Sequence, residues 1–209
     1  PTWKASGDLA LNGSVLAPHE GAGWAIHAQV RLAHGTLEGV PVAGPITQME
    51  GTARLTEESL EVEELSGILL DSPWKLEGTL AFRPAAVELL FTGRQQLARL
   101  AAAFPAAAQD WHPEGIAMVR AVCRGPLEPA GRLDFRSHAE VRHTIITGAK
   151  LIDPLTDVDG AIDVDHLTQR LSIASLTGRL RGEPLTLSGE VGFRPPLQLA
   201  LHATGRAPC

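Results

Sequence analysis

Several features that mark common protein classes are missing from this sequence. It has no tyrosine and two cysteines, and neither Cys123 nor Cys209 lies in a CxxC pair or beside histidines at metal-binding spacing. The most apolar stretch, residues 100–108, is broken by Pro105 and is far shorter than the roughly 20 residues of a membrane span. No signal peptide is recognisable, and because the sequence begins at Pro1 we expect any targeting segment to lie outside it.

Positive charge is also scarce. The formal net charge is −6, whereas nucleic-acid binding usually needs a basic surface that neutralises phosphates. The same balance gives no support to electrostatic docking on an anionic membrane. No HExxH, GxSxG or phosphate-binding glycine loop occurs, so we expect neither an enzyme nor a cofactor. A catalytic triad assembles across space, and a cryptic hydrolase is therefore kept only as a remote third hypothesis.

A long internal repeat is the strongest signal in the sequence. The matched positions are Gly51 with Gly160, Gly67 with Gly178, Gly78 with Gly189, and the Phe-Arg-Pro triplets at 82–84 and 193–195. A weaker match extends upstream and sets His27 on His138. We expect two units, residues 1–109 and 110–209. The second unit stops sooner than the first, which predicts that the natural chain is longer.

Apolar side chains alternate with polar ones through most of both units, as in residues 74–82 and 185–193. This period of two predicts strands with one apolar and one solvated face, which is typical of antiparallel sheets. Gly78 and Gly189 interrupt their strands at matching places, which predicts a bulge or bend there. One short helix is predicted at about 95–104, before Pro105, as a connector.

The densest acidic run raises the question of a calcium site. Its members are Asp153, Asp157, Asp159, Asp163 and Asp165. Their spacing does not fit an EF-hand loop, and Asp163 and Asp165 alternate with apolar residues. We expect these two carboxylates on the solvent face of one strand, and no metal site.

Several phrases resemble the AsmA-like family of bacterial envelope proteins. They are Pro154 to Gly160, Leu171 to Ile173, Leu176 to Gly178 and Leu185 to Gly189, with a looser copy from Pro45 to Gly78. The resemblance implies a mainly β chain whose tandem repeats form an elongated, twisted antiparallel sheet curled into an open trough, with one short helix. It also implies a periplasmic protein, anchored in the inner membrane when full length, that transfers phospholipid towards the outer membrane.

The leading hypothesis is therefore a fragment of a lipid-transport groove, whose partners are phospholipid and, through other parts of the chain, membranes. The runner-up is a closed β-sandwich or barrel that serves as a structural or adhesive module without ligand. Bare edge strands also leave edge-to-edge self-association open. The residues expected to contact lipid are Leu55, Leu60, Val62, Leu65, Trp74, Leu76, Leu80, Phe82, Val87, Leu89 and Phe91 in unit one, and Ile162, Val164, Leu171, Ile173, Leu176, Leu185, Leu187, Val191, Phe193, Leu197, Leu199 and Leu201 in unit two.

Overall fold

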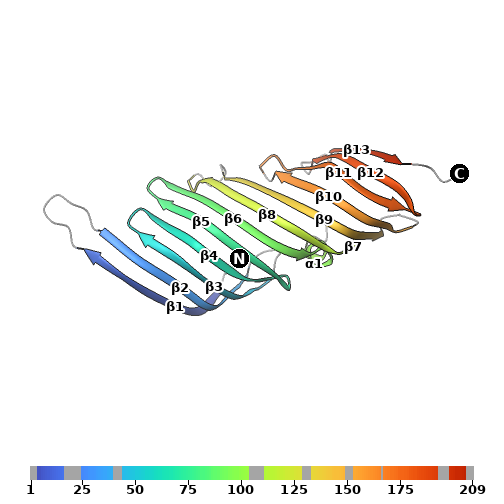
Figure 1. The fold of residues 1–209 in the computed structure, drawn as a ribbon. Coiled ribbons are helices and arrows are strands. Elements are labelled where there is room, and N and C mark those ends of the chain that lie inside the picture. The colour runs from blue at the N-terminus through green and yellow to red at the C-terminus, as the bar shows by residue number, and fades with distance from the viewer. Residues whose placement is uncertain are drawn as a thin grey trace. The chain divides into compact units, whose positions relative to one another are not determined.

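The computed structural model describes residues 4–16, 25–39, 44–103, 111–128, 133–148, 153–165, 167–192 and 198–205. The chain is mainly β (Figure 1). The first six strands are β1 (Lys4–Leu16), β2 (Ala25–Glu38), β3 (Ile46–Thr56), β4 (Ser59–Leu69), β5 (Ser72–Phe82) and β6 (Ala85–Gln96). A short helix, α1 (Leu97–Ala103), follows β6. The remaining strands are β7 (Trp111–Glu114), β8 (Ile116–Pro126), β9 (Asp134–Gly148), β10 (Leu155–Asp165), β11 (Arg170–Leu180), β12 (Glu183–Gly192) and β13 (Gln198–Gly205).

All of these strands belong to one sheet. Each strand from β1 to β6 pairs with its neighbour in sequence, β8 follows β6, and the order then runs on to β13, with the short β7 pairing β9. Neighbouring strands such as β1 and β2, β3 and β4, and β10 and β11 pair antiparallel, as the period of two predicts. Within each unit the strands bend along their length, as a curled sheet requires (Figure 1). The predicted fold class, a mainly antiparallel sheet with one short helix, is confirmed.

The contacts divide the chain into two compact units. One comprises Pro1–Thr92 with Val122–Asp134, and the other comprises Gly93–Ala121 with Phe135–Cys209. This division cuts across β6 and β8, because those strands are hydrogen-bonded neighbours. The repeat itself follows the strand order instead, with β1 to β6 matching β8 to β13 on either side of the expected boundary after residue 109.

The backbone repeats as the sequence does. Gln48 and Asp157, at matching places in β3 and β10, both have positive φ, at 52° and 50°. Gly78 and Gly189 have φ values of 136° and 143°. The register between β4 and β5 shifts after Val62, and that between β11 and β12 shifts after the matching Ile173. A bulge or bend was predicted at the two glycines, and a register shift begins where each of them pairs.

One detail of the sequence match was wrong. The sequence places His27 on His138, an offset of 111 residues. In the structure His34 and His143 both have positive φ, at 54° and 48°, and Ala28 pairs Leu55 as Ser137 pairs Val164, which gives an offset of 109 between β2 and β9. A slip of two residues keeps every side chain on its face, so hydrophobic alternation alone could not detect it.

The helix is shorter than expected. Gln95 and Gln96 end β6, and α1 begins at Leu97, where the backbone N–H of Leu97 donates to the carbonyl oxygen of Gly115 at 3.0 Å. Phe104, the expected last residue of the helix, lies outside the described residues. None of the described helices is long and apolar enough to cross a membrane.

Candidate functional site

The candidate site is the apolar face of the sheet, built in the first unit from rows of directly opposed side chains. Opposed residues on antiparallel strands lie about 4.5–5.5 Å apart between Cβ atoms and point to the same side. Three rows cross β1 to β5: Gly13, Ala28, Leu55, Leu60 and Leu80; Leu11, Val30, Ala53, Val62 and Gly78; and Leu9, Leu32, Gly51, Leu65 and Leu76. None of these positions carries a charge.

The second unit has three such rows on β9 to β13, and their members on β9 to β12 match those on β2 to β5. They are Ser137, Val164, Leu171, Val191 and Leu199; Ala139, Ile162, Ile173, Gly189 and Leu201; and Val141, Gly160, Leu176, Leu187 and Ala203. One serine interrupts the apolar set, and again no residue is charged. The structure therefore places the predicted residues of β3 to β5 and of β10 to β12 on shared faces.

Exposure differs between the two units. In the first unit most of the predicted residues are half-buried, Phe82 is 39% exposed, and the β1 residues Leu9 and Leu11 are 69% and 65% exposed. Within that unit the described residues contribute no helix and no second sheet to cover the face. Among the described residues of this unit the face therefore presents a continuous apolar surface, of the kind that binds apolar ligands.

Two predicted residues of the first unit are packed instead. Trp74 is 6% exposed and stacks on Phe91, with ring centroids 5.9 Å apart, and Val87 is 7% exposed. The indole Nε1 of Trp74 is buried without a hydrogen-bond partner. These two side chains contribute to a local core, so they line the face less than the leucines around them.

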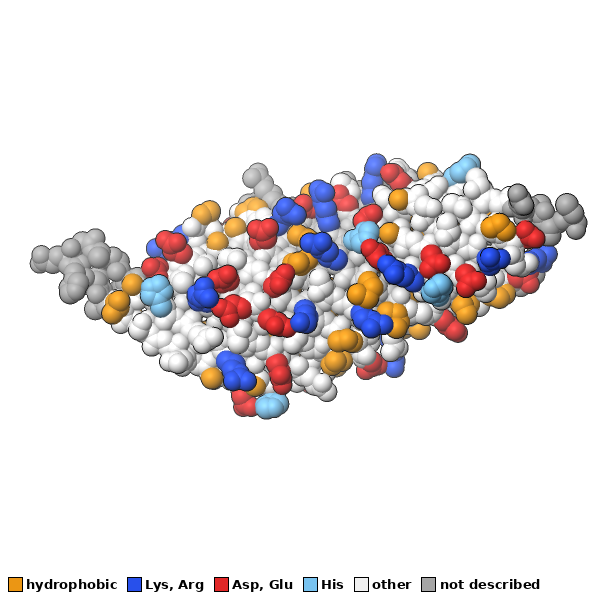
Figure 2. Space-filling model, viewed as in Figure 1, with side chains coloured by type: hydrophobic (Ala, Val, Ile, Leu, Met, Phe, Trp, Pro, Cys, Tyr) orange, Lys and Arg blue, Asp and Glu red, His pale blue; other side chains and the backbone are white. Residues whose placement is uncertain are grey.

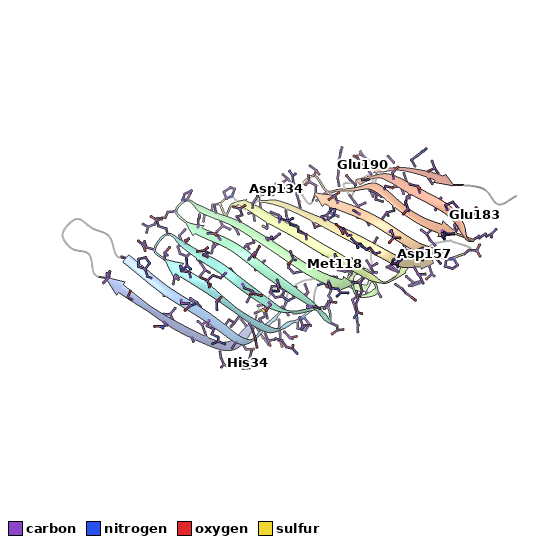
Figure 3. The ribbon with its side chains drawn as sticks, viewed as in Figure 1. His34, Met118, Asp134, Asp157, Glu183 and Glu190 are labelled. Atoms are coloured by element: carbon purple, nitrogen blue, oxygen red, sulfur yellow. The ribbon has the colours of Figure 1, made fainter. Side chains whose placement is uncertain are left out.

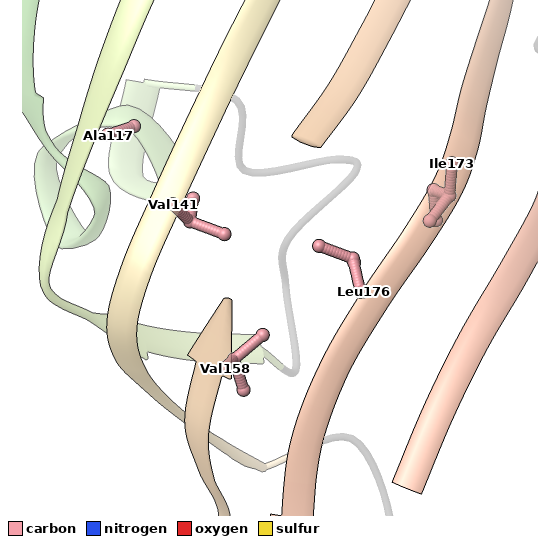
Figure 4. Packing of buried hydrophobic residues seen from close by; sticks show 5 residues of the cluster. All are labelled: Ala117, Val141, Val158, Ile173 and Leu176. Carbon is pink, nitrogen blue, oxygen red and sulfur yellow. The ribbon is translucent and has the colours of Figure 1, made fainter. Parts of the chain in front are cut away.

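Part of the second unit's face is covered. Ala117, Val141, Val158, Ile173 and Leu176 form a buried cluster (Figure 4), against which Leu97 of α1 packs. Leu187 also packs against this cluster, whereas Leu201 is 44% exposed. Two predicted residues, Phe193 and Leu197, lie outside the described residues, and the same holds for the side chain of Leu199.

The opposite face of the sheet is polar. In the first unit Arg54 lies between two carboxylates, 3.4 Å from Glu61 and 2.9 Å from Glu63. Lys75 lies 2.6 Å from Glu64, which raises the pKa of the lysine. Figure 2 shows acidic and basic side chains interspersed over the surface that it views. Such exposed pairs of both signs stabilise little but keep the surface solvated.

The aspartates of the acidic run are dispersed among separate partners. Asp153 pairs with Arg181, Asp157 lies 3.8 Å from Arg179, and Asp163 pairs with His138. Asp159 accepts a hydrogen bond from the backbone N–H of His143, and Asp165 accepts from two backbone N–H groups, which lowers its pKa. Asp163 is exposed, as predicted for the solvent face, and Figure 3 shows Asp157 and Glu190 at the surface. Among the described residues no three His, Cys, Asp or Glu side chains come together as metal ligands.

Two other features offer little chemistry. Cys123 is half-buried, and burial raises the pKa of its thiol, which disfavours the nucleophilic thiolate. Cys209 lies outside the described residues.

A depression of about 690 Å³ beside β1 to β4 is lined by charges of both signs, including Arg31, Glu50 and Glu64. Mixed charges there select no particular ligand.

The sequence-based site omitted residues that belong to the same face. Leu9, Leu11, Val30 and Leu32 extend the rows across β1 and β2. Their alternation with polar residues is the sequence signal that marks them. The opposite face of the second unit also has exposed apolar side chains, Ile116 at 44% and Met118 at 51%. No family model, no curated protein and no solved structure matches this chain.

Proposed function

We propose that the apolar face shelters the acyl chains of phospholipid, as part of a longer periplasmic protein that moves lipid from the inner to the outer membrane. One observation carries the proposal: three rows of apolar side chains run across five strands of each unit without a charge among them. The resemblance of the sequence to the AsmA-like family supports the same function.

The dimensions of the strands suit an acyl chain. β3, β4 and β5 each have 11 residues, a length of about 36 Å at roughly 3.3 Å per residue. The hydrocarbon core of a bilayer is about 30 Å thick, so a strand of this length exceeds one extended acyl chain. Burial contributes about 0.8 kcal/mol per methylene, and ten buried methylenes contribute about 8 kcal/mol before the costs of binding.

The alternative is a structural or adhesive module without ligand. A sandwich of this kind buries its apolar faces between two packed sheets. The described strands belong to one sheet, and in the first unit most of the apolar rows remain half-buried or exposed. This geometry favours the lipid-binding proposal over the closed module.

The test uses two adjacent residues of β5 that point to opposite faces. Leu80 lies in an apolar row, whereas Thr79 pairs with Glu61 on the polar face, and both are half-buried. The purified chain, Leu80→Asp and Thr79→Asp are compared by native mass spectrometry for co-purified phospholipid and by binding of a fluorescent phospholipid. We expect Leu80→Asp to lose lipid and Thr79→Asp to retain it, because only the first places a carboxylate among acyl chains.

Circular dichroism and thermal unfolding show whether both variants remain folded. Leu80 suits this purpose better than Leu187, which packs against the buried cluster of the second unit. Equal lipid binding by both folded variants, or a stable chain that never binds phospholipid, would overturn the proposal. The second outcome would favour the ligand-free module.

A further inference from the structure

The short helix α1 lies against the apolar face of the second unit and covers part of it. Leu97, Leu100 and Ala101 stand at positions i, i+3 and i+4 of the helix, and all three are half-buried. Ala98 and Ala102, on the other side of the helix, are exposed. Leu97 packs against the buried cluster of Figure 4. The side that α1 turns to the sheet is therefore its apolar side.

The cluster that α1 covers belongs to the same apolar rows that the proposed function uses. Val141, Ile173 and Leu176 are members of both the cluster and the rows. The row that contains Ile173 continues to Leu201, which is 44% exposed. Acyl chains and α1 therefore suit the same surface, and both cannot occupy it at once.

A polar side chain is enclosed at this covered part of the face. The sheet is antiparallel and the backbone N–H of Leu97 donates to the carbonyl oxygen of Gly115, so Gln95 lies opposite Ala117, two positions along each strand. Gln95 is 2% exposed, and its side-chain nitrogen and oxygen have no hydrogen-bond partner among the described residues. A buried amide without partners costs free energy that a hydrated amide does not. The docked arrangement is therefore less stable than its apolar contacts alone would make it.

The sequence of α1 gives the helix little stability of its own. It has seven residues, a length at which a helix is marginal without tertiary contacts. It has no acidic residue in its first turn and no basic residue in its last, so no charged side chain complements its dipole. Its apolar side is half-buried and not fully enclosed. Such a helix can leave the sheet without disrupting the strands.

We propose that α1 is an autoinhibitory cover. When it is docked, it closes the apolar face of the second unit to lipid, and when it is undocked, that face becomes a second site for acyl chains. This inference rests on the proposed lipid-binding function, since both concern the same apolar rows. The Gln95 amide keeps the docked state close in free energy to the undocked one, because water reaches the amide when α1 leaves. Lipid binds the undocked state alone and shifts the equilibrium towards it.

The first experiment restores binding to a chain that has lost it. In Leu80→Asp the first unit is blocked, and the docked α1 leaves the second unit closed at lipid concentrations that saturate the unaltered chain. Adding Leu97→Ala and Leu100→Ala removes the apolar contacts of α1 and keeps good helix formers. We expect this triple variant to regain binding of a fluorescent phospholipid. The matched control adds Ala98→Ser and Ala102→Ser to Leu80→Asp, and it should remain unable to bind.

The second experiment follows α1 by hydrogen–deuterium exchange of residues 97–103, since an undocked helix of this length exchanges its amide protons quickly. Gln95→Met keeps the length of the side chain and removes the enclosed amide. We expect it to slow exchange in α1 by about tenfold, because the docked state no longer contains an unpaired polar group. The control is Gln96→Met, the same change at the exposed neighbouring residue, which should leave exchange in α1 as it is.

The outcomes separate this inference from the function on which it rests. An unaltered chain that binds phospholipid, together with a folded triple variant that binds none, would overturn the cover alone. Equal exchange of α1 in Gln95→Met and Gln96→Met would also overturn it. An unaltered chain that never binds phospholipid would overturn both proposals. Circular dichroism shows whether the triple variant is folded, and if it is not, the comparison of Gln95→Met with Gln96→Met decides.

Discussion

At the scale of single residues, His138 on the polar face has a pKa that its neighbours raise. The imidazole Nδ1 of His138 lies 2.7 Å from a carboxylate oxygen of Asp163 on the adjacent strand, and Nε2 lies 3.6 Å from Glu140 on its own strand. The hydrogen bond to Asp163 is the main cause that raises the pKa of His138, and burial opposes it. The protonated imidazole is therefore favoured in the folded chain.

This raised pKa predicts how stability depends on pH. The unfolded histidine has a pKa of about 6.5, so the contribution of the pair is fully present below that pH and is lost as pH rises through the higher folded pKa. Asp163→Asn should therefore destabilise the chain at pH 5.5 and have little effect at pH 8.5. Urea unfolding of both proteins across this range measures the difference. A gap that stays constant or widens with rising pH would contradict the assignment.

The faces of most residues could be predicted from the sequence, but not how deeply each is buried. Leu55, Leu60 and Leu80 were assigned to one apolar face by alternation alone, and they stand in one row. The burial of Trp74 depends on Phe91, which lies on the next strand, and that of Ile173 depends on the cluster against which α1 packs. Alternation within a strand contains no information about such neighbours.

At the scale of the element, glycine positions fix where strands bend. Gly78 has a φ of +136°, and a Cβ there would lie 2.1 Å from the carbonyl oxygen of Glu88. The sequence predicted this bend from the matching Gly189. It could not predict the positive φ of Gln48, because glutamine does not by itself indicate a left-handed backbone. Gln95 and Gln96 were expected in the helix from their propensity, and strand pairing overrides that propensity.

Replacement of the bend glycine should be costly. Gly78→Ala combines an unfavourable φ with a clash against backbone, and we expect a loss of about 1–3 kcal/mol or more in the free energy of unfolding. Gly189→Ala should behave alike. The matched control is Gly192→Ala, where φ is not positive and the nearest atom is a side-chain carbon 3.4 Å away. Urea unfolding compares the three. Equal stability of Gly78→Ala and the control would refute the role of this bend.

At the scale of the whole molecule, charges lie on one side of the sheet in each unit and the apolar rows on the other. Lipid that binds by its acyl chains should therefore bind with an affinity that changes little between low and high salt, since screening acts on charges. Binding also stabilises the folded chain, by about 2.7 kcal/mol at a lipid concentration of 100 times the dissociation constant. Fluorescent-lipid titrations in about 0.05 and about 0.5 M NaCl measure the effect. These concentrations lie on either side of the roughly 0.1 M at which the Debye length is about 10 Å.

The thermal midpoint with and without lipid provides the second measurement, and Leu80→Asp should show no rise. An affinity that falls steeply with salt would show instead that headgroups bind the charged face.

The sequence predicted the division into two faces and the repeat that extends it. It could not predict that α1 covers part of the face in one unit only, because that contact joins Leu97 to residues far along the chain.

The apolar rows of the first unit, which no described element covers, have a consequence for the evolution of the sequence. A leucine between two packed layers must match its neighbours in volume, whereas a leucine on an open face has no partner to fit. Exchange among Leu, Val, Ile and Phe then costs little, while a charge or a lost glycine costs much. Selection on this unit therefore acts on polarity and on a few backbone positions. Its sequence can drift widely while its strand order and bends persist.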